Sequence, residues 1–156
     1  MSHEDVFKPM NIDHVVLRVN DLARSVRFYE DVIGAKVERR VEKIGLAQIR
    51  LGTSMIDLIA VDGPLGREGG AGPGKEGRNV DHICVKIDRF DENGLIRFLR
   101  TSGVEPFDIA KRFGADGYGP VMYCRDPDGN MIELKGPSEP VPANVDTTTV
   151  RQPPPA

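Results

Sequence analysis

The chain has 156 residues, of which 39% are hydrophobic, and it carries a net charge of −3. This length fits one compact domain of roughly 130 residues with a buried core, and no apolar run is long enough to cross a bilayer. We therefore expect a protein that binds neither membranes nor nucleic acid. Its two cysteines form no disulfide framework, and residues 1–5 lack the basic and apolar regions of a secretory signal, so we expect a cytoplasmic protein.

The first half of the chain predicts a strand, a helix and three further strands. Residues 12–19 alternate between two faces as a half-buried strand does. Asn20 and Asp21 then provide a helix N-cap, apolar residues recur at helical spacing, and Gly34 ends the helix. The strand candidates that follow span residues 36–42, 46–51 and 55–61.

The second half repeats this order. Residues 80–87 read Val-Asp-His-Ile-Cys-Val-Lys-Ile, and residues 12–19 read Ile-Asp-His-Val-Val-Leu-Arg-Val. The other predicted elements are a helix at 91–102 and strands at 105–112, 119–125 and 130–135. A turn with the sequence Asp-Pro-Asp-Gly-Asn joins the last two strands.

This duplication predicts an α+β fold. We expect two βαβββ modules that form curled mixed sheets around a metal-binding cleft, with the helices on the outer face. The domain covers residues 11–136, with modules at 11–61 and 80–136 and a Gly-rich linker at 62–79. Residues 1–10 form an N-terminal extension, and residues 137–156 form a Pro-rich tail that is extended or disordered.

Four chemically active side chains fall on the face of the strands that the helices leave open. The alternation places His14 and Asp57 there in the first module, and His82 and Glu133 in the second. Two imidazoles and two carboxylates suit one divalent ion of Ni, Co, Zn, Fe or Mn. The alternative is that each histidine is hydrogen-bonded to a carboxylate and no metal is bound.

Four further residues are candidates for substrate binding. Arg18 and Lys86 alternate in phase with the two histidines, and cations there favour an anionic substrate such as a carboxylate or a thiol conjugate. Tyr123 and Arg125 share a face of the penultimate strand and are candidates for the pocket lining.

Residues 11–136 resemble the vicinal oxygen chelate superfamily, the group of glyoxalase I, bleomycin-resistance proteins, extradiol dioxygenases and methylmalonyl-CoA epimerase. The two His-containing strands carry the resemblance, together with residues 25–34 (Ser-Val-Arg-Phe-Tyr-Glu-Asp-Val-Ile-Gly) and residues 125–134 (Arg-Asp-Pro-Asp-Gly-Asn-Met-Ile-Glu-Leu). It implies that His14, His82 and Glu133 are metal ligands and that Glu133 is also the catalytic base. Asp57 stands where glyoxalase I has a Glu and the epimerase has a Gln.

The resemblance implies a metal-dependent lyase or isomerase of glyoxalase I type, which acts on a small substrate with vicinal oxygens through a metal-stabilised enediolate. One alternative is an extradiol-type dioxygenase, in which Asp57 does not bind the metal directly. Another is a non-catalytic ligand-binding protein of bleomycin-resistance type.

We also expect a homodimer, because the long linker allows the modules to pair with those of a second copy. In many resembling proteins the paired modules come from different chains. Pairing within one chain is the alternative.

Overall fold

The computed structural model describes residues 9–149 and 151–152, and both predicted modules are present. The elements of the first module are β1 (His14–Val19), α1 (Leu22–Asp31), β2 (Lys36–Val41), β3 (Leu46–Leu51) and β4 (Ser54–Ala60). The elements of the second module are β5 (His82–Lys86), α2 (Glu92–Thr101), β6 (Phe107–Gly114), β7 (Gly117–Arg125) and β8 (Met131–Lys135). Two short 3-10 turns, η2 (Glu42–Ile44) and η3 (Gly66–Gly69), lie between strands.

Each module forms a four-stranded mixed sheet, which confirms the α+β prediction. The strand orders are β1-β4-β3-β2 and β5-β8-β7-β6. The first strand of each module runs parallel to the last one, and the remaining neighbours are antiparallel. Because β1 and β5 stand at sheet edges, each presents one side with unpaired backbone groups.

Both helices begin at an aspartate N-cap. The side chain of Asp21 accepts a hydrogen bond from the Arg24 amide, and that of Asp91 accepts one from the Gly94 amide. Each satisfies a backbone donor that the first turn leaves without a partner. The chain leaves the helices at Gly34 and Gly103, whose positive φ angles of 79° and 75° suit glycine.

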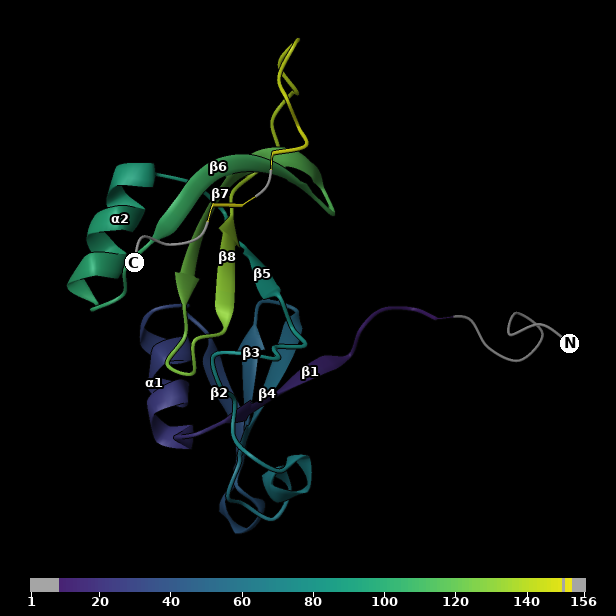
Figure 1. The fold of residues 1–156 in the computed structure, drawn as a ribbon, viewed down its shortest axis with the longest axis vertical. Coiled ribbons are helices and arrows are strands. Elements are labelled where there is room, and N and C mark those ends of the chain that lie inside the picture. Colours follow the sequence, from purple (N-terminus) through teal and green to yellow (C-terminus); the bar gives the residue numbers. More distant parts are fainter. Residues whose placement is uncertain (1–8, 150, 153–156) are drawn as a thin grey trace, which may run out of the picture.

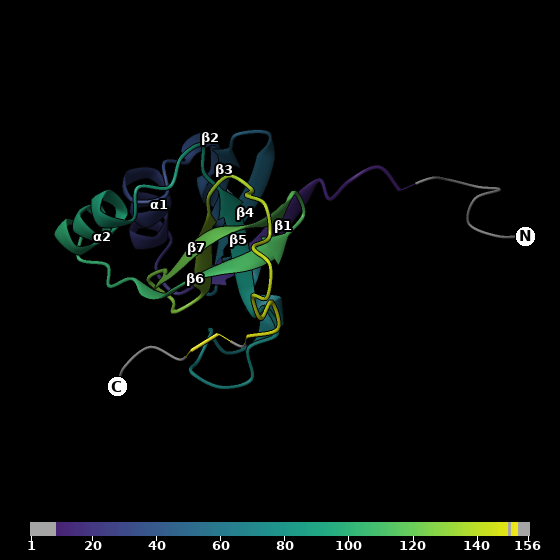
Figure 2. The ribbon, with the colours of Figure 1, turned by 90° about the horizontal axis from the view of Figure 1, so that it is seen from above.

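The helices α1 and α2 lie on the same side of the two sheets (Figures 1 and 2). One hydrophobic core joins the modules, since buried residues such as Leu17 and Leu58 belong to the same cluster as Leu99 and Ile132. This burial confirms the predicted strand phase. On α2, Leu99 is fully buried in this core, whereas its neighbour Phe98 is 47% exposed.

The turn between β7 and β8 connects the second module to the first. The hydroxyl of Tyr29 on α1 donates a 2.9 Å hydrogen bond to Asp126, and the hydroxyl of Ser25 donates to Asp128. Asn20 donates to Asp128 through both its backbone and its side-chain nitrogen. The Asp-Pro-Asp-Gly turn therefore fixes the relative position of the modules.

The linker and the tail contain little regular structure in the described residues but both contact the domain. The linker includes η3 and is held by Arg18. After β8, Ser138 donates to the Asp116 carbonyl, and the backbone of Glu139 donates to that of Tyr118. The first residues of the tail thus pack against the second module. No helix among the described residues is long and apolar enough to cross a membrane.

Candidate functional site

The first half of the candidate site consists of His14 and Asp57. Nε2 of His14 lies 4.0 Å from Oδ2 of Asp57, and Nδ1 of His14 lies 2.6 Å from Oδ1 of Asp13. The Asp13 hydrogen bond, followed by the charge of Asp57, raises the pKa of His14 above its usual value. Asp57 is only 6% exposed, and the Gln48 amide donates to both of its carboxylate oxygens at 3.1 Å.

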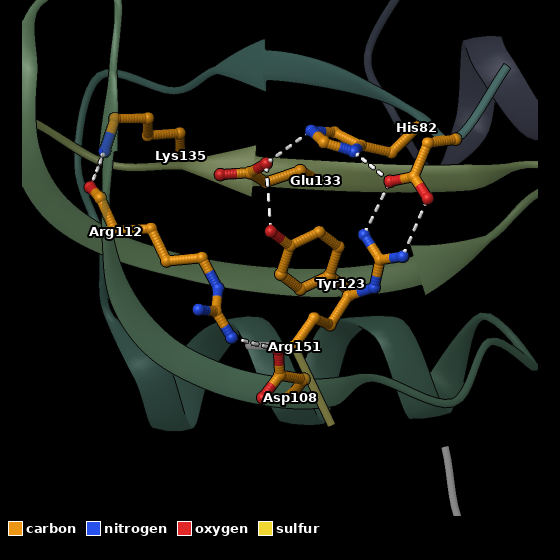
Figure 3. Close-up of polar contacts among 8 residues, drawn as sticks. His82, Asp108, Arg112, Tyr123, Glu133, Lys135 and Arg151 are labelled. Atoms are coloured by element: carbon orange, nitrogen blue, oxygen red, sulfur yellow. Dashed lines mark hydrogen bonds and ion pairs between the residues drawn. The ribbon is translucent and has the colours of Figure 1, made fainter. Parts of the chain in front are cut away.

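The second half consists of His82 and Glu133 (Figure 3). Nε2 of His82 lies 3.0 Å from Oε2 of Glu133, and Nδ1 lies 2.7 Å from Oδ2 of Asp81. Glu133 is 5% exposed and accepts a 3.1 Å hydrogen bond from the Tyr123 hydroxyl. Burial, followed by the charge of Glu133, raises the pKa of Tyr123 to about 12, so that this phenol remains a donor at neutral pH.

The two halves have the same strand register. Asp57 is paired with Val16, two residues after His14, and Glu133 is paired with Cys84, two residues after His82. A parallel first and last strand therefore brings one imidazole beside one carboxylate in each module. The duplication in the sequence corresponds to a duplicated geometry.

Within one chain the four residues form two pairs. Among the described residues, no three His, Cys, Asp or Glu side chains are grouped closely enough to hold a metal ion. The convergence of all four in one cleft stays a prediction, and so does their role as ligands. The His82–Glu133 contact also has the form of the alternative in which a histidine is hydrogen-bonded to a carboxylate.

Arg18 contacts the linker. Its guanidinium donates to the carbonyl oxygens of Gly66, Gly69 and Ala71 at 3.0 Å and to that of Gly70 at 2.6 Å. This geometry requires the linker backbone to approach closely, since a Cβ atom at Gly69 would lie 2.4 Å from the guanidinium carbon. Arg18 thus fixes the linker against β1, and its role in substrate binding stays a prediction.

The three other substrate-binding candidates differ in their surroundings. Tyr123 touches Glu133, whereas Lys86 forms an exposed ion pair with Asp116 at 2.8 Å. The guanidinium of Arg125 lies over the Phe107 ring, 5.3 Å from its centroid, and donates to the Gly129 carbonyl. Arg125 also lines a separate cavity of about 730 Å³ between α1 and the second module.

The sequence interpretation missed Arg151. Its guanidinium makes two hydrogen bonds to Asp81, at 2.8 and 3.0 Å, and lies 5.3 Å from the Tyr123 ring centroid. The hydrogen bonds from Arg151, followed by the hydrogen bond with His82, lower the pKa of Asp81 well below its usual range. Nothing in the Pro-rich tail marked this residue, because its neighbours in space come from distant strands.

The sequence interpretation also missed Gln48 and Lys135. The phase of β3 could have indicated Gln48, whose register partner in the sheet is Asp57. Lys135 lines a cavity of about 350 Å³ together with His82 and Glu133, and it lies two residues after Glu133 on the same strand.

A family model described as the Glyoxalase/Bleomycin resistance protein/Dioxygenase superfamily matches residues 11–134. The chain is 30% identical to a lactoylglutathione lyase of Haemophilus influenzae over 133 residues, covering 80% of this chain and 91% of that protein. It is 27% identical to the human mitochondrial methylmalonyl-CoA epimerase over 134 residues, covering 80% and 72% of the two chains. Among solved structures, an integron cassette protein from the mobile metagenome of V. cholerae superimposes with a TM-score of 0.65 at 28% identity, covering 85% of this chain and 99% of that one.

Proposed function

Since the chain belongs to the Glyoxalase/Bleomycin resistance protein/Dioxygenase superfamily, we propose that it is a metal-dependent lyase or isomerase. Its substrate is a small molecule with vicinal oxygens. Two of its relatives are named for the reaction that they catalyse, a lactoylglutathione lyase and a methylmalonyl-CoA epimerase.

One observation carries this proposal: each module buries a carboxylate beside an imidazole. Asp57 and Glu133 are nearly inaccessible, and the basic side chains within ion-pair distance of them in the described structure are histidines, which carry a charge only when protonated. Burying a carboxylate without a compensating charge costs several kcal/mol. A divalent ion would supply that charge for both modules.

The donor set fits a borderline metal such as Ni, Co, Zn, Fe or Mn, because it combines imidazole nitrogens with carboxylate oxygens. His14, Asp57, His82 and Glu133 would hold the ion. When bound, a metal of this kind acts as a Lewis acid that stabilises negative charge on a coordinated oxygen. Each module supplies only half of the donors, so we propose that two copies of the chain pair their modules as a homodimer.

The other groups at the site position the donors and move a proton. Asp81 lies 2.7 Å from Nδ1 of His82, and by accepting a hydrogen bond from that nitrogen it would leave Nε2 to bind the ion. Glu133 is the base that removes a proton from the substrate carbon, and the cavity that it lines with His82 gives a substrate room to reach its carboxylate. Tyr123 holds the Glu133 carboxylate in place.

We favour a lyase or isomerase over an extradiol-type dioxygenase because two carboxylates are buried at equivalent positions of the two modules. A non-catalytic binding protein would not need a second buried carboxylate at the strand position that matches Glu133. Asp57 separates the lyase from the dioxygenase, since only the first uses it as a ligand.

The test is turnover by full-length protein loaded in turn with Ni, Co, Zn, Fe or Mn. Two assays are run: isomerisation of the methylglyoxal–glutathione hemithioacetal, and exchange of the methylmalonyl-CoA α-proton with deuterated water. We expect one of them to proceed, to stop with a chelator, and to be lost in Glu133→Gln. Arg100→Gln, which removes an exposed ion pair with Glu105, is the matched control and should retain activity. Bound metal without turnover in either assay contradicts both reactions, and oxygen uptake with a catechol would establish the dioxygenase instead.

A further inference from the structure

The cavity beside Glu133 contains a buried cation that the proposed chemistry does not use. This cavity has a volume of about 350 Å³ and lies over β5 and β8, closed on one side by the β6–β7 hairpin and on another by the start of the tail. Its volume is at the small end of the range for ligand sites in proteins. His82 and Glu133 contribute to its lining, so it is continuous with the second half of the candidate site.

Lys135 is the cation in question. Its side chain is on the same face of β8 as that of Glu133, and the residue is only 3% exposed. Its ammonium donates to the backbone carbonyl of Arg112 at 2.7 Å (Figure 3). An ammonium has three donors, and within the described part of the chain no carboxylate lies within ion-pair distance of this one.

The other charged groups of the cavity are already paired. Lys86 contacts Asp116 at 2.8 Å, and Glu133 contacts His82 at 3.0 Å. Lys135 is therefore a charged group of the lining that has no ion-pair partner among the described residues. A buried ammonium without a counter-ion is unfavourable, and an anion in the cavity would supply the missing charge.

We propose that this cavity binds an oxyanion of the substrate through Lys135, with Lys86 at its entrance. The inference rests on the proposed function and narrows its substrate class to small vicinal-oxygen compounds that also carry a carboxylate, phosphonate or phosphate group. Residues two apart on a strand are separated by roughly 7 Å. The anionic group thus lies a few bonds from the carbon whose proton Glu133 removes, and Lys135 selects and orients the substrate.

Anion binding is measured on metal-free, full-length protein by amide NMR, with titrations of acetate, methylphosphonate and inorganic phosphate. We expect saturable shifts at Gly114, Asp116 and Gly136, which surround the cavity. The anion that binds most tightly distinguishes a planar carboxylate from a tetrahedral oxyanion. Shifts confined to other parts of the protein, or no saturable shift with any of the three anions, would overturn the proposal.

Variants separate this role from a structural one. Lys135→Met keeps the length and buries no charge, so it should fold at least as stably and weaken anion binding about ten- to a hundred-fold, the range for a lost charged hydrogen bond. Lys86→Met alters an exposed side chain and should weaken binding less. Lys111→Met is the control, because Lys111 pairs with Glu139 outside the cavity lining, and its affinity should be unchanged. Undiminished binding by Lys135→Met would mean that Lys135 only anchors β6.

Metal uptake is measured separately by calorimetry on the wild type and on Lys135→Met, and both should bind the ion equally. Anion binding without metal uptake would refute the proposed function and leave the anion site intact. Metal uptake with unchanged anion affinity in Lys135→Met would refute the anion site alone.

Discussion

The hydroxyl of Tyr29 donates a 2.9 Å hydrogen bond to the carboxylate of Asp126, and this buried contact connects α1 of the first module to the β7–β8 turn of the second. Asp126 also accepts from the backbone amides of Asp128 and Asn130. The open faces of the two sheets are thereby held in a fixed relation. The position of each half-site depends on a contact far from either histidine.

Tyr29→Phe should destabilise the chain by about 1–3 kcal/mol, because it removes a donor from a buried carboxylate. Burial already raises the pKa of Asp126, and the Tyr29 hydrogen bond opposes that rise. Tyr29→Phe should therefore raise the pKa of Asp126 further. A carboxyl whose pKa is raised in the folded state stabilises the fold at low pH, and this stability is lost as the pH rises through the folded-state pKa. The loss caused by Tyr29→Phe should therefore be larger at pH 7 than near pH 4. Urea unfolding of both proteins at the two pH values measures it, and an equal loss at both would contradict a charged Asp126 as the acceptor.

Complementation should reveal whether the half-sites join between chains. In a dimer that pairs the first module of one copy with the second of the other, His14→Ala and His82→Ala chains form a mixed dimer with one intact site. An equimolar, remixed sample should recover about a quarter of the wild-type activity per site, because half of the dimers are mixed and each has one working site. Metal content of the mixture is a second readout. Two inactive parents that stay inactive after verified subunit exchange would place the pairing within one chain.

Removal of the Arg151 side chain should change the pKa of Asp81 more than that of any other carboxylate. Hydrogen bonds from Arg151 are the leading cause of the lowered pKa of Asp81, so Arg151→Gln should shift this pKa upward toward its usual value. Carboxyl NMR titration follows the shift directly, with Arg100→Gln as the exposed control. If Asp81 titrates identically in the wild type and in Arg151→Gln, the tail does not contact the site in solution.

Arg18→Met should release the linker without unfolding the domain. Four linker carbonyls accept from this guanidinium, while the alkyl part of the side chain is retained by methionine. We expect faster hydrogen exchange and new proteolytic cleavage at residues 66–71, with the strands unaffected. Arg39→Met, which removes an exposed arginine from β2, is the control. Unchanged hydrogen exchange at residues 66–71 would mean that Arg18 does not hold the linker and that the 3-10 turn η3 is stable without it.

Local sequence patterns predicted the order of elements, the faces of the strands and the helix ends. The two-residue period of a strand decided that His14 and Asp57, or His82 and Glu133, share one face. Asp21 and Asp91 as N-caps, and Gly34 and Gly103 after the helices, are local choices that depend on few neighbours. The same periodicity could not show that Phe98 is exposed, because that depends on what packs against α2.

Contacts between distant segments were decided only by the tertiary structure. The sequence determined two similar modules with one imidazole and one carboxylate each, because alternation and duplication are local properties. It did not determine that Arg151 reaches Asp81, that Arg18 holds the linker, or that Lys135 is buried beside Glu133. Those arrangements depend on strand register and loop closure across dozens of residues, which the folded chain fixes through its shared core and the Tyr29–Asp126 contact.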